Sequence, residues 1–173
     1  MMKKFLLLIL SFLVATMFFA FFAKEKSKLE LMDYTFEQIP LTLQLPKTTY
    51  VIENYISGSE ILFSSFLQDK KYGYWGYIQL WDIADLEDFL KTSKSQSNYK
   101  FASYNSIKIG LKNYNGFRIY WTAKFKNNRN VIGKEYFLRN KNDKPILRIS
   151  FFTDELNQNQ FDQLTKQIML SLK

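Results

Sequence analysis

The chain has 173 residues, a formal net charge of +8 and an aromatic content of 18%, and it contains neither cysteine nor histidine. Without these residue types, disulfides, thiol nucleophiles, iron–sulfur clusters, the usual zinc sites and any triad built on His or Cys are excluded. A metal ion would have to be held by oxygen ligands alone, as calcium or magnesium can be.

The first 23 residues predict a membrane helix. Two lysines near the start precede residues 5–23, a run of 19 residues without a charge. As a helix this run is about 28 Å long, enough to cross the hydrocarbon core of a bilayer. A cleaved signal peptide has a shorter apolar run and a small-x-small site, whereas Phe21 would occupy the outer position of a site ending at Ala23. We therefore expect an uncleaved signal anchor over 1–23, with a cleaved signal peptide as the alternative.

The side of the membrane depends on weaker evidence. Lysines flank the apolar run at both ends, so the positive-inside rule is nearly balanced. Because N-terminal anchors of this kind usually export the domain on their C-terminal side, we expect a single-pass protein of the cell membrane with an extracytoplasmic C-terminal domain. Residues 24–34 are charged and aperiodic and are predicted to be a juxtamembrane linker, which leaves a single domain over 35–173.

Three segments in the first half of this domain predict β-strands. Residues 36–45 alternate between apolar and polar side chains and stop at a proline. Residues 60–67 form a second apolar run after a Ser-Gly-Ser turn, and residues 74–81 form a third.

The apolar period then changes to that of a helix. Acids cluster at 82–88, where they complement a helix N-terminus, and Asp82 or Asp85 is expected to cap it. The helix is expected to end near residues 95–98. Its apolar stripe consists of Ile83, Leu86, Phe89 and Leu90.

Four further strands predict an antiparallel meander. The Asn115-Gly116 pair is a strong hairpin signal, and polar turns separate the remaining segments. An amphipathic helix closes the chain, with Phe161, Leu164 and Ile168 on one side and Asn157 as its expected cap. The predicted fold class is α+β, an antiparallel sheet of about six or seven strands flanked by helices. The four strand segments are residues 105–112, 117–126, 131–139 and 146–152.

This order of elements resembles the PsbP-like superfamily, which includes PsbP of photosystem II and LpqN-type exported domains. The resemblance covers about residues 35–172 and implies an antiparallel sheet flanked by helices, used mostly as a binding or accessory module. No position matches a metal site of PsbP, so none is carried over. The segments that carry the resemblance are Phe36-x-x-Ile39-Pro40 with Leu45-Pro46, Asp85–Phe89, Gly116–Trp121 and Ile149-Ser150-Phe151.

Basic residues suggest one binding surface. Between Lys91 and Arg148 there are 14 Lys and Arg residues and only two acids. Strand alternation predicts that several lie on one sheet face, opposite the apolar stripe, where they would attract anionic lipid, acidic wall polymers or an acidic protein. The alternative is a solvated sheet face without a ligand, and export argues against nucleic acid. The predicted basic face comprises Lys108, Lys112, Arg118, Lys124, Lys126, Arg139 and Arg148.

Aromatic residues suggest a second surface. Trp75, Tyr77 and Trp81 share one side of a predicted strand, and exposed rings of this kind stack on sugars in glycan-binding proteins. The alternative is that a helix covers these rings and that they belong to the core.

Motifs for catalysis are missing from the sequence. It has no nucleophile elbow, no phosphate-binding loop and no paired carboxylates on adjacent predicted strands, and helix capping explains the acids at 82–88 better than calcium does. We therefore predict a non-enzymatic binding module without metal or cofactor, for a protein partner or an anionic envelope component. The alternatives are a cell-wall glycan-binding module and an uncharacterised hydrolase that uses converging acids such as Glu53, Glu60 or Glu135.

Overall fold

The computed structural model describes residues 29–54, 60–97, 99–111, 113–125, 128–140 and 145–173. Residues Leu31–Lys173 form one compact unit. The predicted anchor over 5–23 lies outside the described residues and stays a prediction. Among the helices that are described, none has both the length and the apolar character needed to cross a membrane.

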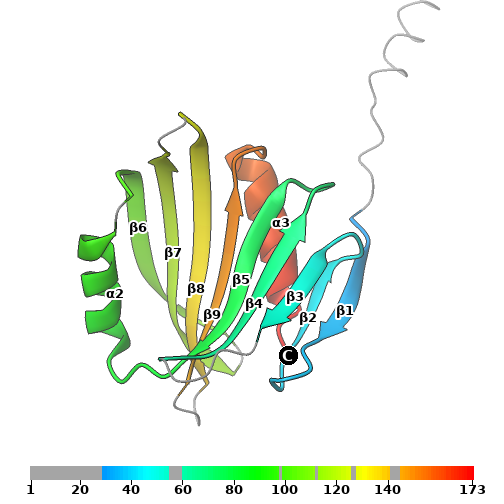
Figure 1. Cartoon of the computed structure of the whole chain (residues 1–173), viewed down its shortest axis with the longest axis horizontal. Helices are drawn as coiled ribbons and strands as arrows, with labels where there is room; N and C mark the ends of the chain where they lie inside the picture. The colour runs from blue at the N-terminus through cyan, green and yellow to red at the C-terminus, as the bar shows by residue number, and fades with distance from the viewer. Residues whose placement is uncertain (1–28, 55–59, 98, 112, 126–127, 141–144) are drawn as a thin grey trace, which may run out of the picture. The chain divides into compact units, whose positions relative to one another are not determined.

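In the described part of the chain, seven strands form one antiparallel sheet in the order β3-β4-β5-β9-β8-β7-β6 (Figure 1). The meander predicted for the second half is confirmed as β6 to β9. Pairing of β9 with β5 joins this meander to the strands of the first half. The bounds are β3 (Tyr50–Asn54), β4 (Ile61–Asp69), β5 (Tyr74–Trp81), β6 (Phe101–Gly110), β7 (Tyr114–Lys124), β8 (Asn130–Asn140) and β9 (Ile146–Thr153).

Two further strands, β1 (Leu31–Thr35) and β2 (Thr42–Pro46), pair as a separate antiparallel hairpin. The single strand predicted over 36–45 is therefore wrong, because residues 36–41 form the bend between these two strands. Pro40 lies in this bend, where its fixed φ and missing N–H end strand pairing. Strand β1 also begins at Leu31, inside the segment predicted as linker.

The predicted hairpin between β6 and β7 is present, but its turn is not at Asn115-Gly116. Leu111 and Tyr114 exchange backbone N–H···O bonds of 2.8 and 3.2 Å, and Asn115 and Gly116 already belong to β7. A Cβ at position 116 would collide with the carbonyl oxygen of Phe137 on the neighbouring strand. Glycine is therefore required here for close approach of two strands rather than for a turn.

Both predicted helices are present, as α2 (Leu86–Gln96) and α3 (Gln158–Leu170). Asp85 caps α2 by accepting a 3.0 Å hydrogen bond from the Asp88 N–H. Asn157 caps α3 in a reciprocal capping box with Gln160. Together with the sheet, these helices confirm the α+β fold class.

The two helices pack on opposite faces of the sheet, here called the α2 face and the α3 face. Leu86 and Leu90 of α2 are buried in one cluster with Trp121 of β7. On the other face, Phe161 of α3 is fully buried, and Asp162 of α3 forms a 2.6 Å ion pair with Lys134 of β8. Since side chains alternate along a strand, neighbours in sequence lie on different faces.

Tyr136 of β8 lies on the α3 face, and burial raises its pKa from 10.0 to about 12. Between these values the unfolded chain loses the phenolic proton while the folded chain keeps it, so the free energy of unfolding must fall as pH rises. We expect Tyr136→Phe to reduce this fall, measured as urea stability at about pH 9 and about pH 11. Part of the fall should remain, because burial also raises the pKa of Tyr74.

The matched control is Tyr50→Phe, at a tyrosine that is 62% exposed on the edge strand β3. The free energy of unfolding of this variant should fall between about pH 9 and about pH 11 by as much as that of the unmodified chain. If the free energy of unfolding of the Tyr136→Phe variant falls by the same amount, Tyr136 is not a source of the pH dependence.

Candidate functional site

A cavity of about 590 Å³ lies between α2 and the α2 face of the sheet. We call it the aromatic cleft, because eleven rings from α2, five strands and the loops that follow α2 and β7 line it. The α2 face places them there by alternation, since every second residue of β5, β7 and β9 points to this side. The rings are Trp75, Tyr77, Trp81, Phe89, Tyr99, Phe101, Tyr104, Trp121, Phe125, Phe137 and Phe152.

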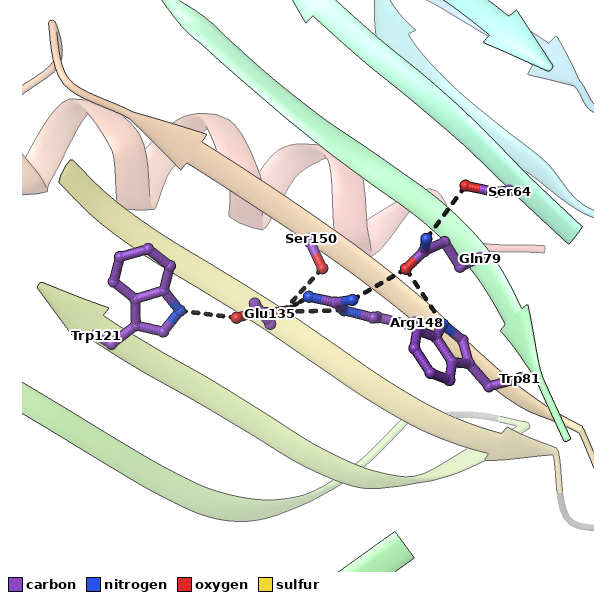
Figure 2. Close-up of polar contacts among 7 residues, drawn as sticks. All are labelled: Ser64, Gln79, Trp81, Trp121, Glu135, Arg148 and Ser150. Atoms are coloured by element: carbon purple, nitrogen blue, oxygen red, sulfur yellow. Dashed lines mark hydrogen bonds and ion pairs between the residues drawn. The ribbon is translucent and has the colours of Figure 1, made fainter. Parts of the chain in front are cut away.

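A network of polar side chains runs across the strands of the sheet at this cleft and includes two of the rings, Trp81 and Trp121 (Figure 2). At its centre, the carboxylate of Glu135 accepts two hydrogen bonds from the Arg148 guanidinium, from Nε at 3.0 Å and Nη2 at 2.6 Å. The same carboxylate accepts from the Trp121 indole at 2.7 Å and from the Ser150 hydroxyl at 3.1 Å. Four donors therefore satisfy a carboxylate whose residue is only 8% exposed.

Gln79 extends the network across β5. Its amide oxygen accepts from Arg148 Nη1 at 3.0 Å and from the Trp81 indole at 3.2 Å. Its amide nitrogen donates to the Ser64 hydroxyl at 3.1 Å. The register explains the contact, because Gln79 and Arg148 are directly paired across β5 and β9.

The network itself carries no net charge, and the one charge left in the described lining of the cleft is that of Lys94, whose Nζ lies 4.4 Å from the ring centre of Tyr104. Arg148 and Glu135 neutralise each other, and the guanidinium also lies 5.9 Å from the ring centre of Trp81 and 5.4 Å from that of Phe137. Both Trp81 and Trp121 donate their indole N–H to the network. Their rings are thus held in one orientation in the absence of any ligand.

The three rings predicted as an aromatic site lie together, as expected from their spacing. Trp75, Tyr77 and Trp81 all line the aromatic cleft. Tyr77 is 37% exposed, and the two tryptophans are half-buried. Since α2 does not cover them completely, their part in ligand binding stays a prediction.

Beyond the cleft, the α2 face continues over β3 and β4 without a charged side chain among the described residues of these strands. The register places Ile52, Phe66 and Tyr77 in one row across β3, β4 and β5. The ring centres of Phe66 and Tyr77 are 5.6 Å apart. The remaining side chains of this uncharged surface are Tyr50, Asn54, Ser64 and Gln68.

The prediction of one basic face is wrong, because the assumed register of β6 and β7 differs from the actual one. Lys108 is paired with Phe117, whereas Arg118 is paired with Ile107 and Tyr136. Lys108 therefore lies on the α2 face and Arg118 on the α3 face. Arg139 and Arg148 share the α2 face, and Lys124 shares the α3 face. Lys112 and Lys126 lie outside the described residues.

Partners within the domain engage the basic residues of the α2 face. Arg148 is paired with Glu135, and Lys108 forms a 2.7 Å ion pair with Glu87 of α2. Arg139 donates to the carbonyl oxygens of Ile83 and Ala84, both at 3.2 Å, and so fixes the segment that precedes α2. These contacts are structural, and ligand binding by the basic residues remains a prediction.

Sequence reasoning missed the polar centre of the cleft. Glu135 was considered only as an acid for hydrolysis, and Gln79 and Trp121 were not considered as site residues. A carboxylate in the middle of the apolar strand 131–139 was the available signal, since such a group needs buried partners. Among the described residues that line the cleft, Glu135 is the only acid, and neither Glu53 nor Glu60 belongs to this lining. The converging carboxylates that the hydrolase alternative required are therefore not found there.

Solved structures that share this architecture include two proteins from different organisms. Cyanobacterial PsbP (CyanoP) from Synechocystis sp. PCC 6803 matches with a TM-score of 0.57 and 10% identity, over 87% of this chain and 96% of the other. The Saccharomyces cerevisiae Ran-binding protein Mog1p matches with a TM-score of 0.52 and 9% identity, over 84% and 96%. The fold is PsbP-like. No protein-family model matches the chain, and no curated protein matches its sequence. At such low identities the likeness establishes the PsbP-like fold alone.

The ion pair in the cleft leads to a stability prediction. Glu135→Leu removes the acidic partner of Arg148, whose side chain is only 24% exposed. An unpaired charge in such a place should lower the free energy of unfolding by about 2–3 kcal/mol, measured by chemical denaturation. The double variant Glu135→Leu/Arg148→Met should recover most of this loss. If the double variant loses as much free energy of unfolding as the two single variants lose together, the two residues are not coupled.

Proposed function

We propose that the domain is a non-enzymatic binding module whose ligand occupies the aromatic cleft. The observation that carries this proposal is that half-exposed rings, Trp75 and Tyr77 among them, line a cleft in which a polar network already fixes Trp81 and Trp121. Glu135 is unsuited to act as a general base, because its carboxylate accepts four hydrogen bonds and is paired with Arg148. Preformed walls reduce the entropy lost on binding, which favours recognition over chemistry.

The ligand class that fits best is an uncharged glycan. Its sugar rings would stack on Trp75 and Tyr77, and its hydroxyls would exchange hydrogen bonds with the exposed Gln68. The surface over β3 and β4 adds amide and hydroxyl groups without any charge among its described residues. Among the described residues that line the cleft, an anionic polymer would meet Lys94 as its only counter-charge, since Arg148 is already neutralised by Glu135.

The predicted anchor over 5–23 supports this proposal, because it determines where the domain would be located. A module tethered on the outer side of the cell membrane would meet cell-wall glycan directly. A protein partner is the second candidate, and it is supported by the Ran-binding protein Mog1p, which shares the fold.

Glycan binding can be tested with the full chain in a polyoxyethylene detergent, which carries no sugar headgroup. Calorimetric titration with chitotetraose and with soluble peptidoglycan fragments should detect binding to at least one of them. Trp75→Ala and Tyr77→Ala should each weaken it about tenfold, since a stacked ring contributes on the order of 1 kcal/mol or more.

The control for this titration is Tyr120→Ala, which removes a half-buried ring on the opposite face. Its affinity should equal that of the unmodified chain. Equal weakening by all three variants would indicate a general loss of structure. No binding of either glycan by the unmodified chain would contradict the glycan assignment.

The proposed topology can be tested by cysteine labelling, because the chain contains no cysteine of its own. Lys91→Cys places one thiol on an exposed position of α2. A membrane-impermeant maleimide should label it in intact cells. Lys3→Cys, on the predicted inner side, should be labelled only after permeabilisation. The reverse pattern would show that the domain is cytoplasmic.

A further inference from the structure

A second concave surface lies on the opposite side of the sheet from the aromatic cleft. It is a groove of about 630 Å³ between α3 and the uncovered part of the α3 face over β6 and β7. Helix residues one turn apart, Gln158, Asp162 and Lys166, form one wall, which Leu170 extends. Ile109 and Arg118 of the sheet contribute to the other wall and the floor. We call this surface the α3 groove.

The α3 groove has a positive charge that nothing described in the domain neutralises. Its described lining contains three cationic residues and one acid. The acid, Asp162, is already paired with Lys134, whose side chain is only 7% exposed. Arg118 and Lys166 form no ion pair with any described residue of the domain. Lys166 is exposed on the helix, while Arg118 is half-buried on the sheet.

Apolar side chains accompany these charges. Leu170 is 75% exposed at the end of α3. Ile107 and Ile109, whose alternation predicts a buried stripe, are only half-buried, because β6 is the outermost strand and α3 does not reach over it. A groove with uncompensated cations between apolar walls suits a ligand that carries both acidic and apolar groups.

We propose that the α3 groove binds an acidic amphipathic segment of a partner protein. A second copy of this chain is disfavoured, because a symmetric contact would bring two surfaces of positive charge together. A lipid bilayer is also disfavoured, because a broad flat surface would not reach the half-buried Arg118 beside α3. A single extended or helical peptide is narrow enough to place carboxylates on Arg118 and Lys166 and an apolar side chain against Leu170.

Synthetic peptides provide the test, with the full chain kept in a polyoxyethylene detergent. A fluorescein-labelled peptide of alternating Glu and Leu should bind in fluorescence anisotropy, whereas the alternating Lys and Leu peptide should not. Arg118→Glu/Lys166→Glu should weaken binding about tenfold or more. The control Lys91→Glu/Lys100→Glu changes the net charge equally at exposed positions outside the groove, and it should leave the affinity unchanged.

Several outcomes would overturn this proposal. One is that both double variants weaken peptide binding equally. Another is that an all-Glu peptide binds as tightly as the alternating Glu and Leu peptide. A third is that short-chain phosphatidylserine, and not the peptide, binds through Arg118 and Lys166. If Arg118→Glu prevents folding, amide chemical shifts of the unmodified chain should still change at α3 and β6 on adding the peptide. Shifts confined to other elements would also overturn it. Because the aromatic cleft lies on the other face, glycan binding and peptide binding can fail independently.

Discussion

The sheet of this domain is wider than the helices that cover it. Neighbouring strands lie about 4.8 Å apart, so seven strands span about 29 Å, whereas a helix with its side chains is about 10 Å wide. One helix therefore covers only part of a sheet face. Because α2 packs on one face and α3 on the other, each face keeps an uncovered region. The aromatic cleft and the α3 groove both result from this single geometric constraint.

The two uncovered regions differ in chemistry because the sheet presents different side chains on its two faces. On the α2 face, the ion pair between Arg148 and Glu135 is internal, and the indoles of Trp81 and Trp121 are bonded to the same network. On the α3 face, the ion pair between Lys134 and Asp162 ties the helix to the sheet and leaves Arg118 without an acid among the described residues. Internal neutralisation of Arg148 leaves Lys94 as the only unpaired charge in the described lining of the cleft, which favours a ligand with little charge there. The absence of such neutralisation at Arg118 favours an acidic ligand in the groove.

Much of the fold was predictable because its signals are local. Alternation identified β5 and the meander, while Asp85 and Asn157 marked the helix starts through hydrogen bonds to N–H groups three residues later. Errors arose where a local signal has two physical causes. A glycine can indicate a turn or the close approach of two strands, and Gly116 has the second role. The segment 36–45, predicted as one strand, contains a bend at Pro40.

The sequence by itself determined both helices with their capping residues, the strands from β4 onward, the grouping of Trp75, Tyr77 and Trp81, and the exclusion of His and Cys chemistry, but not β1 or β3. Each of these depends on residue identity or on spacing within one segment. Only the tertiary structure decided which strands pair, and hence that Arg148 meets Glu135 and that Lys108 and Arg118 lie on opposite faces. A shift of one residue in register exchanges the two faces of a strand, and register depends on contacts between segments far apart in the chain.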